Sequence, residues 1–598
     1  MANQRTKAAS ESIAFLAISA GVLIGFNAIF AILPPLRLDW TEDELYTLSQ
    51  GTKRLASSIT DRLEIVAYFS EDLPPPFNAT ERDVRDILSE YQAAAGSNLV
   101  VTFISPDTEA EKEEAQEAGI SPVRHQQVTA DGAQVVEGYR GIVMRYLDRT
   151  EVIPVVQDTS GLEYQLTTKL SLLLNEKHTI AVLTGHEGAT LQEGLQTLQA
   201  CAPLYDFREV SAESEIDPEI EALLIVGPQT PLSDAELRNI DSFVMAGGSL
   251  GIFGGSVALT VDNQQPSFSA VDTGVNTLLR PYGVVMESEM LLDTQCRRMQ
   301  TPQGPRSSPP FVLVDLTLRQ STSCSNNDDC LDTAGPGFQC DKGTCQHPVT
   351  FRLEETWAPF GAALEVTEGA SDRAAVIAVS TENSWTQDVS TINAGTGFTP
   401  RSEGEKPLMV AIEGTIPSAF EEGQTSSDEA RVLVTGSALM VRDEILGQVQ
   451  QMARQQCPMI GPFASALNAI DWLAQDADLI AVRAKDVSDP SLRVPENVES
   501  AEEEAEEATR QAAEAGQDAV NALVQGDQTG LDTAVGSQND AIDAREAAVE
   551  RALLAREEWD AKMQQYRWGN MLGVPFLFAL FGVVRWRMRL TRRKNISI

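Results

Sequence analysis

Short apolar runs alternate with helical patterns through most of the chain, and they predict two consecutive α/β regions. In the first region, residues 62–70 and 99–106 are predicted strands, and residues 81–95 carry apolar side chains at helical spacing between them. A strand, a helix and a second strand of these lengths predict a βαβ unit with a parallel pair of strands. A hairpin over 139–156 and a helix over 161–174 complete the first region.

The second region begins with a continuous apolar strand and repeats the alternation. A helix over 233–246 starts at a capping pair, Ser233 and Glu236, and two glycines end it. This pattern predicts an open parallel sheet with helices on both faces. The predicted strands of the second region are 178–186, 222–228, 250–255, 408–415 and 430–437.

The first long apolar run, residues 13–33, has Asn27 as its one strongly polar side chain. Its 21 residues form a helix of about 31 Å, which is enough to cross a bilayer core. Arg5 and Lys7 precede the run, which favours a cytoplasmic N-terminus, and two prolines follow it instead of a small-residue cleavage site. We therefore expect an uncleaved signal anchor in preference to a cleaved signal peptide.

The second long apolar run, residues 568–586, lies near the other end of the chain. Its apolar core over 571–584 is short enough for a buried helix, but Trp568 and Trp586 flank it as interfacial aromatic residues do. A basic tail follows, which is typical of a cytoplasmic end. We expect a second membrane helix, both termini in the cytoplasm, and the bulk of the chain in the periplasm, outside the inner membrane of a bacterium.

The net charge of the chain limits the kinds of partner that it can bind. The chain has 87 acidic and 45 basic residues, a net charge of −42, with 42% apolar and 22% charged residues. This is an ordinary globular composition, and the negative charge argues against nucleic acid as a partner because phosphate binding needs a cationic surface. Membrane lipid is expected to contact the two terminal helices alone, and long acidic domains are translocated regardless of their charge.

Seven cysteines agree with an oxidising compartment. Four of them lie within 22 residues among Asn, Asp, Gly and Pro, a loop-rich stretch that cannot build an apolar core. We expect two disulfides there; a zinc site near His347 is the alternative, although no C-x2-C pair is present. The spacing leaves the connectivity open, and of the other three either two pair or all are small buried side chains. The four disulfide candidates are Cys324, Cys330, Cys340 and Cys345, and the others are Cys201, Cys296 and Cys457.

The motif search yields one candidate ligand loop and no catalytic set. Thr184, Gly185, His186 and Glu187 follow a predicted parallel strand, at the end where ligands bind in such sheets. His186 is either a general base or a polar residue that caps the next helix, and we favour the second interpretation because no nucleophile has a suitable context. No phosphate-binding G-x-x-x-x-G-K-[ST] motif and no H-E-x-x-H zinc motif occurs. We expect no enzyme activity and no catalytic, cofactor-binding or metal-binding residues.

An acidic, alanine-rich segment separates the second α/β region from the final apolar run. Residues 499–560 hold 17 acidic residues and 4 arginines, a net charge of −13. The segment is either a solvated helical stalk or hairpin, or a coiled-coil arm that docks on a partner. The predicted division of the chain is 1–36, 37–176, 177–490 with a disulfide-rich insertion at about 320–348, 491–567 and 568–598.

The ordered set of segments resembles the gliding-motility-type ABC transporter auxiliary component family. The resemblance covers nearly the whole chain and rests on the segments DWTEDELYTLSQGT (39–52), LEIVAYFS (63–70), VTFISPD (101–107), GYRGIVMRYLDRTEVI (138–153), LEYQLTTKL (162–170), IAVLTGHEG (180–188), the stretch 222–253, RVLVTGSALM (431–440) and NAIDWLAQDADLIAVRAKD (468–486). The cysteine-rich insertion and the unusually acidic arm depart from the family pattern.

The resemblance implies a middle domain similar to flavodoxin-like and glutamine-amidotransferase-like folds. It also implies a non-enzymatic periplasmic subunit that works beside an ABC ATPase and a permease, as a scaffold or substrate-engaging module. Two rival functions remain from the sequence. One is binding of a surface polymer, adhesin or other envelope protein through the cysteine-rich insertion, which an exposed apolar patch on 320–348 would support. The other is a cryptic hydrolase near His186.

Overall fold

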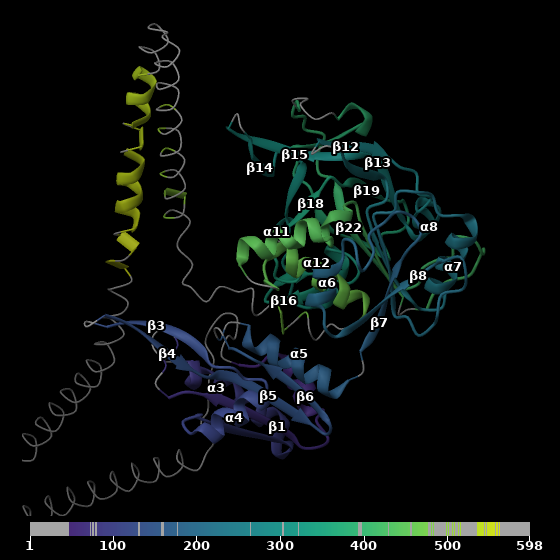
Figure 1. Ribbon diagram of the computed structural model, residues 1–598. Coiled ribbons are helices and arrows are strands. Elements are labelled where there is room, and N and C mark those ends of the chain that lie inside the picture. The colour runs from purple at the N-terminus through teal and green to yellow at the C-terminus, as the bar shows by residue number, and fades with distance from the viewer. Residues whose placement is uncertain are drawn as a thin grey trace, which may run out of the picture. The chain divides into compact units, whose positions relative to one another are not determined.

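The computed structural model describes residues 47–475 with short gaps, and part of the chain beyond them (Figure 1). It divides the chain into two compact units, Met1–Asp489 and Pro490–Ile598. Beyond 475 it describes residues 480, 482–483 and helical positions scattered over 498–562. The gaps before 475 are 72, 74–76, 78–79, 130–131, 157–158, 160, 176, 263–264, 302–303, 321, 393–397, 428–429 and 455–456.

Both expected membrane helices, 13–33 and 568–586, lie outside the described residues. Within the described part of the chain, no helix combines the length and the apolar character needed to cross a bilayer.

The N-terminal sheet has the strand order β2-β1-β5-β6. Strands β1 (Leu63–Phe69) and β2 (Leu99–Ile104) are parallel and α3 (Thr80–Ala95) connects them, which confirms the predicted βαβ unit. Strands β5 (Arg140–Tyr146) and β6 (Arg149–Ile153) form the predicted hairpin and extend the sheet in antiparallel pairing. A separate hairpin of β3 (Val123–Thr129) and β4 (Gly132–Gly138) follows α4 (Glu109–Glu117).

Helices α2 (Gln50–Ser57) and α5 (Leu162–Leu174) are joined by buried hydroxyl groups under this sheet. The Thr52 and Thr167 hydroxyls lie 2.9 Å apart, and Tyr91 of α3 lies 2.7 Å from Thr167. Glu163 accepts hydrogen bonds from the Thr52 hydroxyl and from the Ser49 backbone N–H, at 2.8 and 2.7 Å. The resemblance segments 39–52 and 162–170 thus meet in one polar network within an apolar core.

The central sheet has seven strands in the order β20-β22-β23-β10-β9-β7-β8. The five strands from β23 to β8 are parallel, and β22 and β20 add an antiparallel edge. The segments expected at 408–415 and 430–437 are the strands β22 and β23 of this sheet. Their bounds are β7 (His178–Leu183), β8 (Tyr205–Val210), β9 (Ala222–Val226), β10 (Ser249–Phe253), β20 (Ala374–Val379), β22 (Pro407–Glu413) and β23 (Arg431–Thr435).

Helices cover both faces of the central sheet because alternate residues of its strands are apolar on opposite sides. On one face, α6 (Gln196–Cys201), α11 (Asp443–Ala453) and α12 (Gly461–Leu473) share a core with Ile180 and Leu433. On the other face, α7 (Asp234–Met245) and α8 (Asn276–Tyr282) share a core with Ala181 and Val432. Ser233 and Glu236 form the expected capping box of α7.

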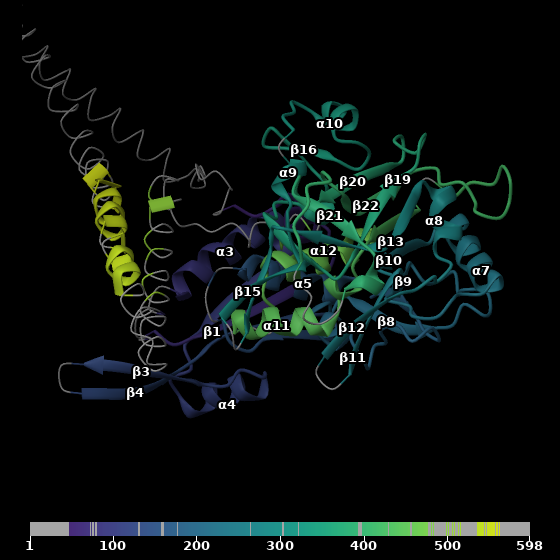
Figure 2. The same cartoon turned by 90° about the horizontal axis from the view of Figure 1, so that it is seen from above.

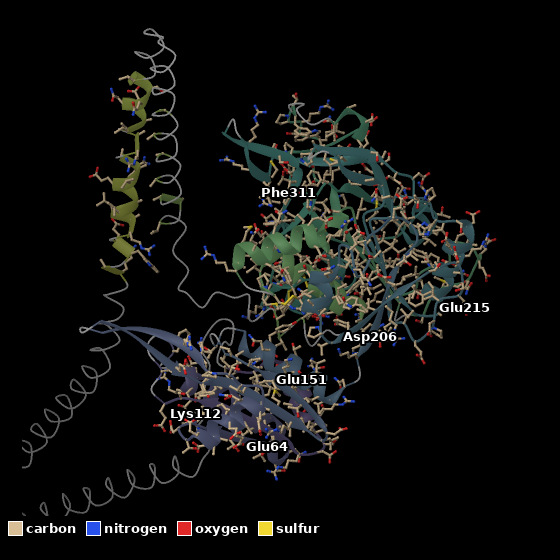
Figure 3. The ribbon with its side chains drawn as sticks, viewed as in Figure 1. Glu64, Lys112, Glu151, Asp206, Glu215 and Phe311 are labelled. Carbon is tan, nitrogen blue, oxygen red and sulfur yellow. A yellow bond between two sulfur atoms is a disulfide. The ribbon has the colours of Figure 1, made fainter. Side chains whose placement is uncertain are left out.

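The stretch between β10 and β20 carries small sheets of its own. Strand β13 (Val284–Asp293) pairs with β19 (Ala362–Val366) and β21 (Ser384–Gln387) outside the central sheet. Strands β14 (Cys296–Thr301), β15 (Gly304–Asp315) and β18 (Glu355–Pro359) form a second small sheet, and β11 (Val257–Asp262) and β12 (Gln265–Ala270) form a hairpin. Phe311 on β15, labelled in Figure 3, packs edge-on against Trp357 of β18.

The second unit is helical at its described positions. Among its helical positions between 535 and 562, Ala548 and Ala552 are buried, whereas Leu553 and Leu554 are exposed. The helical alanines at 501, 505, 508, 512 and 515 are half-buried and follow each other at intervals of four and three residues. Residues three and four apart lie on one side of a helix, so these half-buried alanines share a side.

Candidate functional site

The carboxyl edge of the central sheet is the first place to look for a ligand. Strand β7 lies between β8, which follows it in sequence, and β9, so the chain leaves in opposite directions after β7 and β9. In open parallel sheets, ligands bind at such a switch point. The loop Thr184–Glu187 follows β7 directly and therefore lies at this point.

The loops after β7 and β9 are joined to each other by backbone hydrogen bonds. The Ala189 N–H donates to the Val226 carbonyl at 2.9 Å, and the Gln229 N–H donates to the His186 carbonyl at 2.8 Å. A Cβ at Gly188 would lie 2.7 Å from the Val226 carbonyl oxygen, so this approach requires glycine. These contacts hold the two loops against each other at the switch point.

The His186 side chain is tied to the first turn of α7. Its Nε2 lies 2.9 Å from Glu236 Oε1, and both side chains are largely buried. Glu236 Oε2 accepts hydrogen bonds from the Ser233 hydroxyl and the Ser233 backbone N–H, each at 2.7 Å. Burial raises the pKa of Glu236, but the hydrogen bonds from Ser233 and His186 outweigh it and hold this pKa below its ordinary value.

This arrangement contains a serine, a histidine and a carboxylate in the wrong order for nucleophilic catalysis. A catalytic histidine lies between the nucleophile and the acid, so that it can take the hydroxyl proton. Here the carboxylate of Glu236 lies between Ser233 and His186, and the Ser233 hydroxyl donates to the carboxylate. The geometry supports a role for His186 in holding the β7 loop to α7.

The rest of the candidate loop is bound to its neighbours or exposed. The Thr184 N–H and hydroxyl both donate to the Val210 carbonyl, at 2.9 and 3.2 Å. Gly185 has a φ of 102°, and Glu187, with a φ of 54°, also has left-handed backbone. The Glu187 side chain is exposed, and its carbonyl accepts from the Gln229 amide. The four residues are adjacent, but their polar groups do not converge on a common point.

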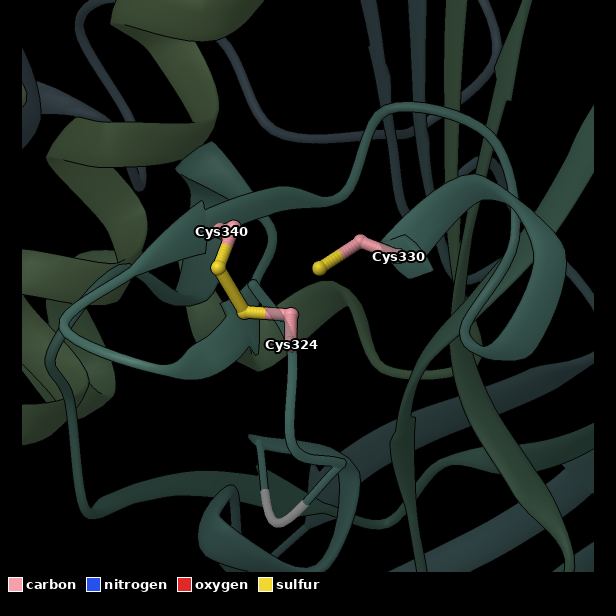
Figure 4. A group of neighbouring side chains, drawn as sticks. All are labelled: Cys324, Cys330 and Cys340. Carbon is pink, nitrogen blue, oxygen red and sulfur yellow. A yellow bond between two sulfur atoms is a disulfide. The ribbon is translucent and has the colours of Figure 1, made fainter. Parts of the chain in front are cut away.

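The cysteine-rich insertion forms two disulfides, Cys324–Cys340, which Figure 4 shows, and Cys330–Cys345. We call residues 324–346 the disulfide knot. It contains α10 (Asn327–Thr333) and a two-stranded sheet of β16 (Gln339–Asp341) and β17 (Thr344–Gln346), and α9 (Thr317–Gln320) precedes it. A third disulfide joins Cys201 to Cys457, and Cys296 is a free thiol.

Zinc does not fit this sulfur group. Sulfur atoms of Cys324, Cys330 and Cys340 lie within 4.8 Å of one another, close enough to suggest a metal site. However, Cys324 and Cys340 are bonded to each other, and Cys330 is bonded to Cys345. A zinc ligand must be a thiolate, and these sulfurs are already oxidised.

His347 anchors the knot to the central sheet. Its ring is fully buried, 5.5 Å from Phe338 of the knot and 5.4 Å from Trp472 of α12. Its Nε2 lies 3.9 Å from Glu413 Oε1, which accepts a hydrogen bond from the Trp472 indole N–H at 3.0 Å. Burial, with a smaller contribution from the charge of Arg431, lowers the pKa of His347 to about 3, so the ring is neutral.

A second buried polar cluster was not predicted from the sequence. Arg483 forms hydrogen bonds with Asn468 of α12 and with the Tyr164 hydroxyl of α5, at 2.5 and 3.1 Å. Asp471 of α12 accepts a hydrogen bond from the Tyr205 hydroxyl at 2.6 Å. These groups join the N-terminal sheet region to the central domain. An isolated arginine in a short segment without periodicity gives no signal by which its burial could be foreseen.

Two known family models match parts of the chain. Residues 177–468 match the model of a family described as an ABC-type uncharacterized transport system. Residues 42–145 match a second family, described as a domain of unknown function. The first match spans the central sheet and its disulfide knot, and the second covers three of the four strands of the N-terminal sheet.

Among curated proteins, the chain is similar to an uncharacterized protein of Borreliella burgdorferi. The two are 22% identical over 423 residues, which cover 68% of this chain and 78% of the relative. Among solved structures, the N-terminal domain of mmIFT52 matches with 15% identity and a TM-score of 0.29, covering 49% of this chain and 96% of that one. An exo-β-1,4-mannosidase, Op5Man5 of Opitutaceae bacterium strain TAV5, matches with 11% identity and a TM-score of 0.22, covering 65% and 48%.

Proposed function

We propose that this protein is a non-enzymatic accessory subunit of a bacterial ABC transporter of the gliding-motility type. A helix at each end holds it in the inner membrane, and its α/β domains lie in the periplasm. The observation that carries the proposal is the match of residues 177–468 to an ABC-type transport family. The ATPase is a separate partner, because the sequence contains no phosphate-binding loop, and the permease is the second partner in this proposal.

Two features of the fold support this function. The polar groups of the candidate loop Thr184–Glu187 bond to separate neighbours and do not converge on one point, which a scaffold role accommodates. Three disulfides suit an oxidising compartment such as the periplasm. The helical second unit serves in this proposal as the connection between the α/β domains and the second membrane helix.

The test is affinity purification of the tagged full-length chain in a mild detergent, with the bound proteins identified by mass spectrometry. We expect a P-loop ATPase and a polytopic permease in stoichiometric amounts. A tagged, unrelated inner-membrane protein with two membrane helices, purified in parallel, gives the background. Recovery of envelope or surface proteins alone, without an ATPase, would refute the transporter assignment.

The location is tested separately from the complex. Cys296 is half-buried and the other six cysteines are oxidised, so a new cysteine is needed as a reporter. We expect a cysteine at exposed Glu215 to react with a membrane-impermeant maleimide in cells whose outer membrane has been permeabilised. A cysteine introduced after Ile598 is expected to react only after the inner membrane is opened. The reverse pattern would contradict the proposed topology.

A further inference from the structure

One edge of the N-terminal sheet is a strand without a charged side chain. Strand β2, with the sequence LVVTFI, pairs with β1 on one side. On its other side, no hydrogen bond joins its backbone to a residue that the structure describes. Thr102 is exposed, and Val100 and Ile104 are half-buried. Such an edge carries a row of N–H and C=O groups that is complementary to another β-strand.

The other edge strands of the two main sheets are protected against pairing. Glu151 on β6 and Asp206 on β8, both labelled in Figure 3, lie on edge strands that also carry Arg149 and Arg208. Charged side chains on an edge oppose its pairing with another chain. The remaining edge strand, β20, is uncharged, but it contacts α9 and β15. In the part of the chain that the structure describes, β2 is the edge of these sheets that has neither protection.

The described residues of this chain do not supply the missing strand. The next strands in sequence after β2 are β3 and β4, which form a two-stranded sheet of their own. Figure 2 shows this hairpin projecting outward from the N-terminal region. A strand that pairs with β2 is therefore to be sought in a second chain.

The sequence of β2 is complementary to its own reverse. In an antiparallel pair, opposed side chains lie on the same face, so a two-fold pairing of β2 with a second copy is centred on one residue. The opposed pairs of a register centred on Thr102 are Thr102–Thr102, Val101–Phe103 and Val100–Ile104. Pairs of two threonines, of a β-branched and an aromatic residue, and of two β-branched residues are favourable across strands.

The charge of the chain favours β2 as the place where two copies meet. With a net charge of −42, two copies repel each other over most of their surface. In a two-fold pair, each charged residue near the centre of an edge lies close to its like-charged counterpart. The sequence has no charged residue from Tyr91 to Pro106, so two copies can pair along β2 without opposing like charges.

We propose that two copies of this chain associate through β2, by antiparallel pairing that joins their N-terminal sheets into one continuous sheet. The two-fold axis is perpendicular to the sheet, so α3 lies on the same face in both copies. Two six-residue strands bury a small area, and the dimer is therefore reversible. This inference goes beyond the proposed function and rests on the N-terminal sheet alone.

The first test places a cysteine at the centre of the expected pair. The purified full-length protein in detergent is treated with a mild oxidant, and Thr102→Cys is expected to form a disulfide-linked dimer because its two thiols are directly opposed. Thr150→Cys is the matched control, at an exposed position on β6 at the other edge of the same sheet, and is expected to stay monomeric. The parent protein, with its half-buried Cys296, gives the background. Equal dimer yields at the two positions would indicate random collision and overturn the proposal.

The second test exchanges charges across the expected interface. Two full-length copies with different affinity tags are produced in the same cells and purified through one tag. Thr102→Lys in both copies, or Thr102→Glu in both, is expected to lower recovery of the second tag about tenfold because like charges are opposed. One copy with Thr102→Lys and the other with Thr102→Glu is expected to restore recovery, which a folding defect would not allow. Thr102→Val is expected to keep the recovery of the parent protein.

The outcomes separate this inference from the transporter assignment. Recovery of the second tag that Thr102→Lys does not change would refute β2 as the contact between copies. A monomeric Thr102→Cys protein that resists maleimide would show that another segment or another protein covers β2, and would also overturn the proposal. The ATPase is scored in the same purifications. Its recovery with Thr102→Lys leaves the transporter assignment standing without the dimer, and its absence from the parent protein counts against that assignment alone.

Discussion

Arg483 and Asp471 form an ion pair at 2.6 Å in which each side chain is only 2% exposed. Burial lowers the pKa of Arg483, but the charge of Asp471 outweighs it and raises this pKa above its ordinary value, so the guanidinium stays charged. The pair is a connection between parts of the chain, because Arg483 also reaches Tyr164 of the N-terminal region. It lies shortly before the boundary at Asp489 between the two units.

Removal of one member of this pair is expected to be far more damaging than removal of both. Burial raises the pKa of Asp471 although Arg483 lowers it, so Arg483→Met leaves a buried carboxyl group that must bind a proton or stay charged without its cation, at a cost of about 3–5 kcal/mol. The double variant Arg483→Met with Asp471→Asn keeps an acceptor for Tyr205 and removes the unpaired carboxyl group, so it is expected to recover more than half of that loss. Chemical denaturation of the full-length protein measures both. Equal destabilisation of the single and double variants would contradict the assigned role of the pair.

The hairpin between β5 and β6 carries strain at its tip. Leu147 has a φ of 53°, a left-handed conformation that is unfavourable for a leucine, and its side chain is exposed. Leu147→Gly is therefore expected to stabilise the protein by about 0.5–1 kcal/mol, since it relieves strain and removes no buried contact. The matched control is Leu331→Gly, an exposed leucine inside a helix, which is expected to destabilise by about 0.5–1 kcal/mol. Shifts of the same sign in thermal unfolding would argue against strain at Leu147.

We expect alanine substitutions at two glycines of the central domain to change the stability of the protein in opposite directions. A Cβ at Gly436 would lie 1.8 Å from the Ala362 carbonyl oxygen, a backbone atom that cannot move aside alone. Gly436→Ala is expected to destabilise by about 3 kcal/mol or more, in the range of severe packing defects. Gly447 lies inside α11 with nothing within 4 Å of its Cβ position, and Gly447→Ala is expected to stabilise by about 1 kcal/mol. Thermal melts of the two variants give the comparison, and a neutral Gly436→Ala would show that the contact relaxes.

His347 predicts a dependence of stability on pH. Its pKa is about 3 in the folded state, against about 6.5 in the unfolded chain. Above pH 6.5 both states are neutral and the stability is complete. As the pH falls from about 6.5 towards 3, the unfolded state binds one proton that the folded state does not, and stability falls by about 1.4 kcal/mol per pH unit.

His347→Asn tests this assignment. In the parent protein the Val349 N–H donates a hydrogen bond to His347 Nδ1 at 3.3 Å. The side-chain oxygen of asparagine can accept this hydrogen bond, and asparagine does not titrate. The variant is expected to be less stable at pH 7, because it loses the contacts with Trp472 and Phe338, and to lose less stability between pH 6.5 and 4 than the parent protein. Denaturation midpoints at four pH values suffice. Parallel pH profiles of variant and parent would exclude His347 as the group responsible.

Individual helices and strands of this fold could be predicted from the sequence. Strands such as β7 and β10 are continuous apolar runs, and the Ser233–Glu236 capping box marks the start of α7, so period and capping sufficed. The position of β13 could not be predicted, because its hydrophobic pattern resembles that of the central strands. Only its pairing with β19 and β21 shows that it belongs to a separate sheet. A bulged register in that pairing leaves no sequence signal.

The pairing of individual side chains could not be predicted from the sequence either. The four clustered cysteines allow three pairings, and the spacing does not choose among them. His186 and Glu236 are fifty positions apart, so the contact that decides the role of the candidate loop depends on how α7 packs. The disulfide of Cys201 with Cys457 requires α6 and the end of α11 to meet over the same face of the sheet.

The pairing of β10 with β23 has a consequence for biosynthesis. The two strands are parallel neighbours in the middle of the sheet, yet β10 ends at Phe253 and β23 begins at Arg431. At a translation rate of about 5–20 residues per second, the partner strand emerges roughly 10–35 s after β10. During that interval an apolar strand, buried on both faces in the finished protein, has an unpaired edge. Until the second half of the chain arrives, the half-made sheet is therefore open to pairing with strands of other chains.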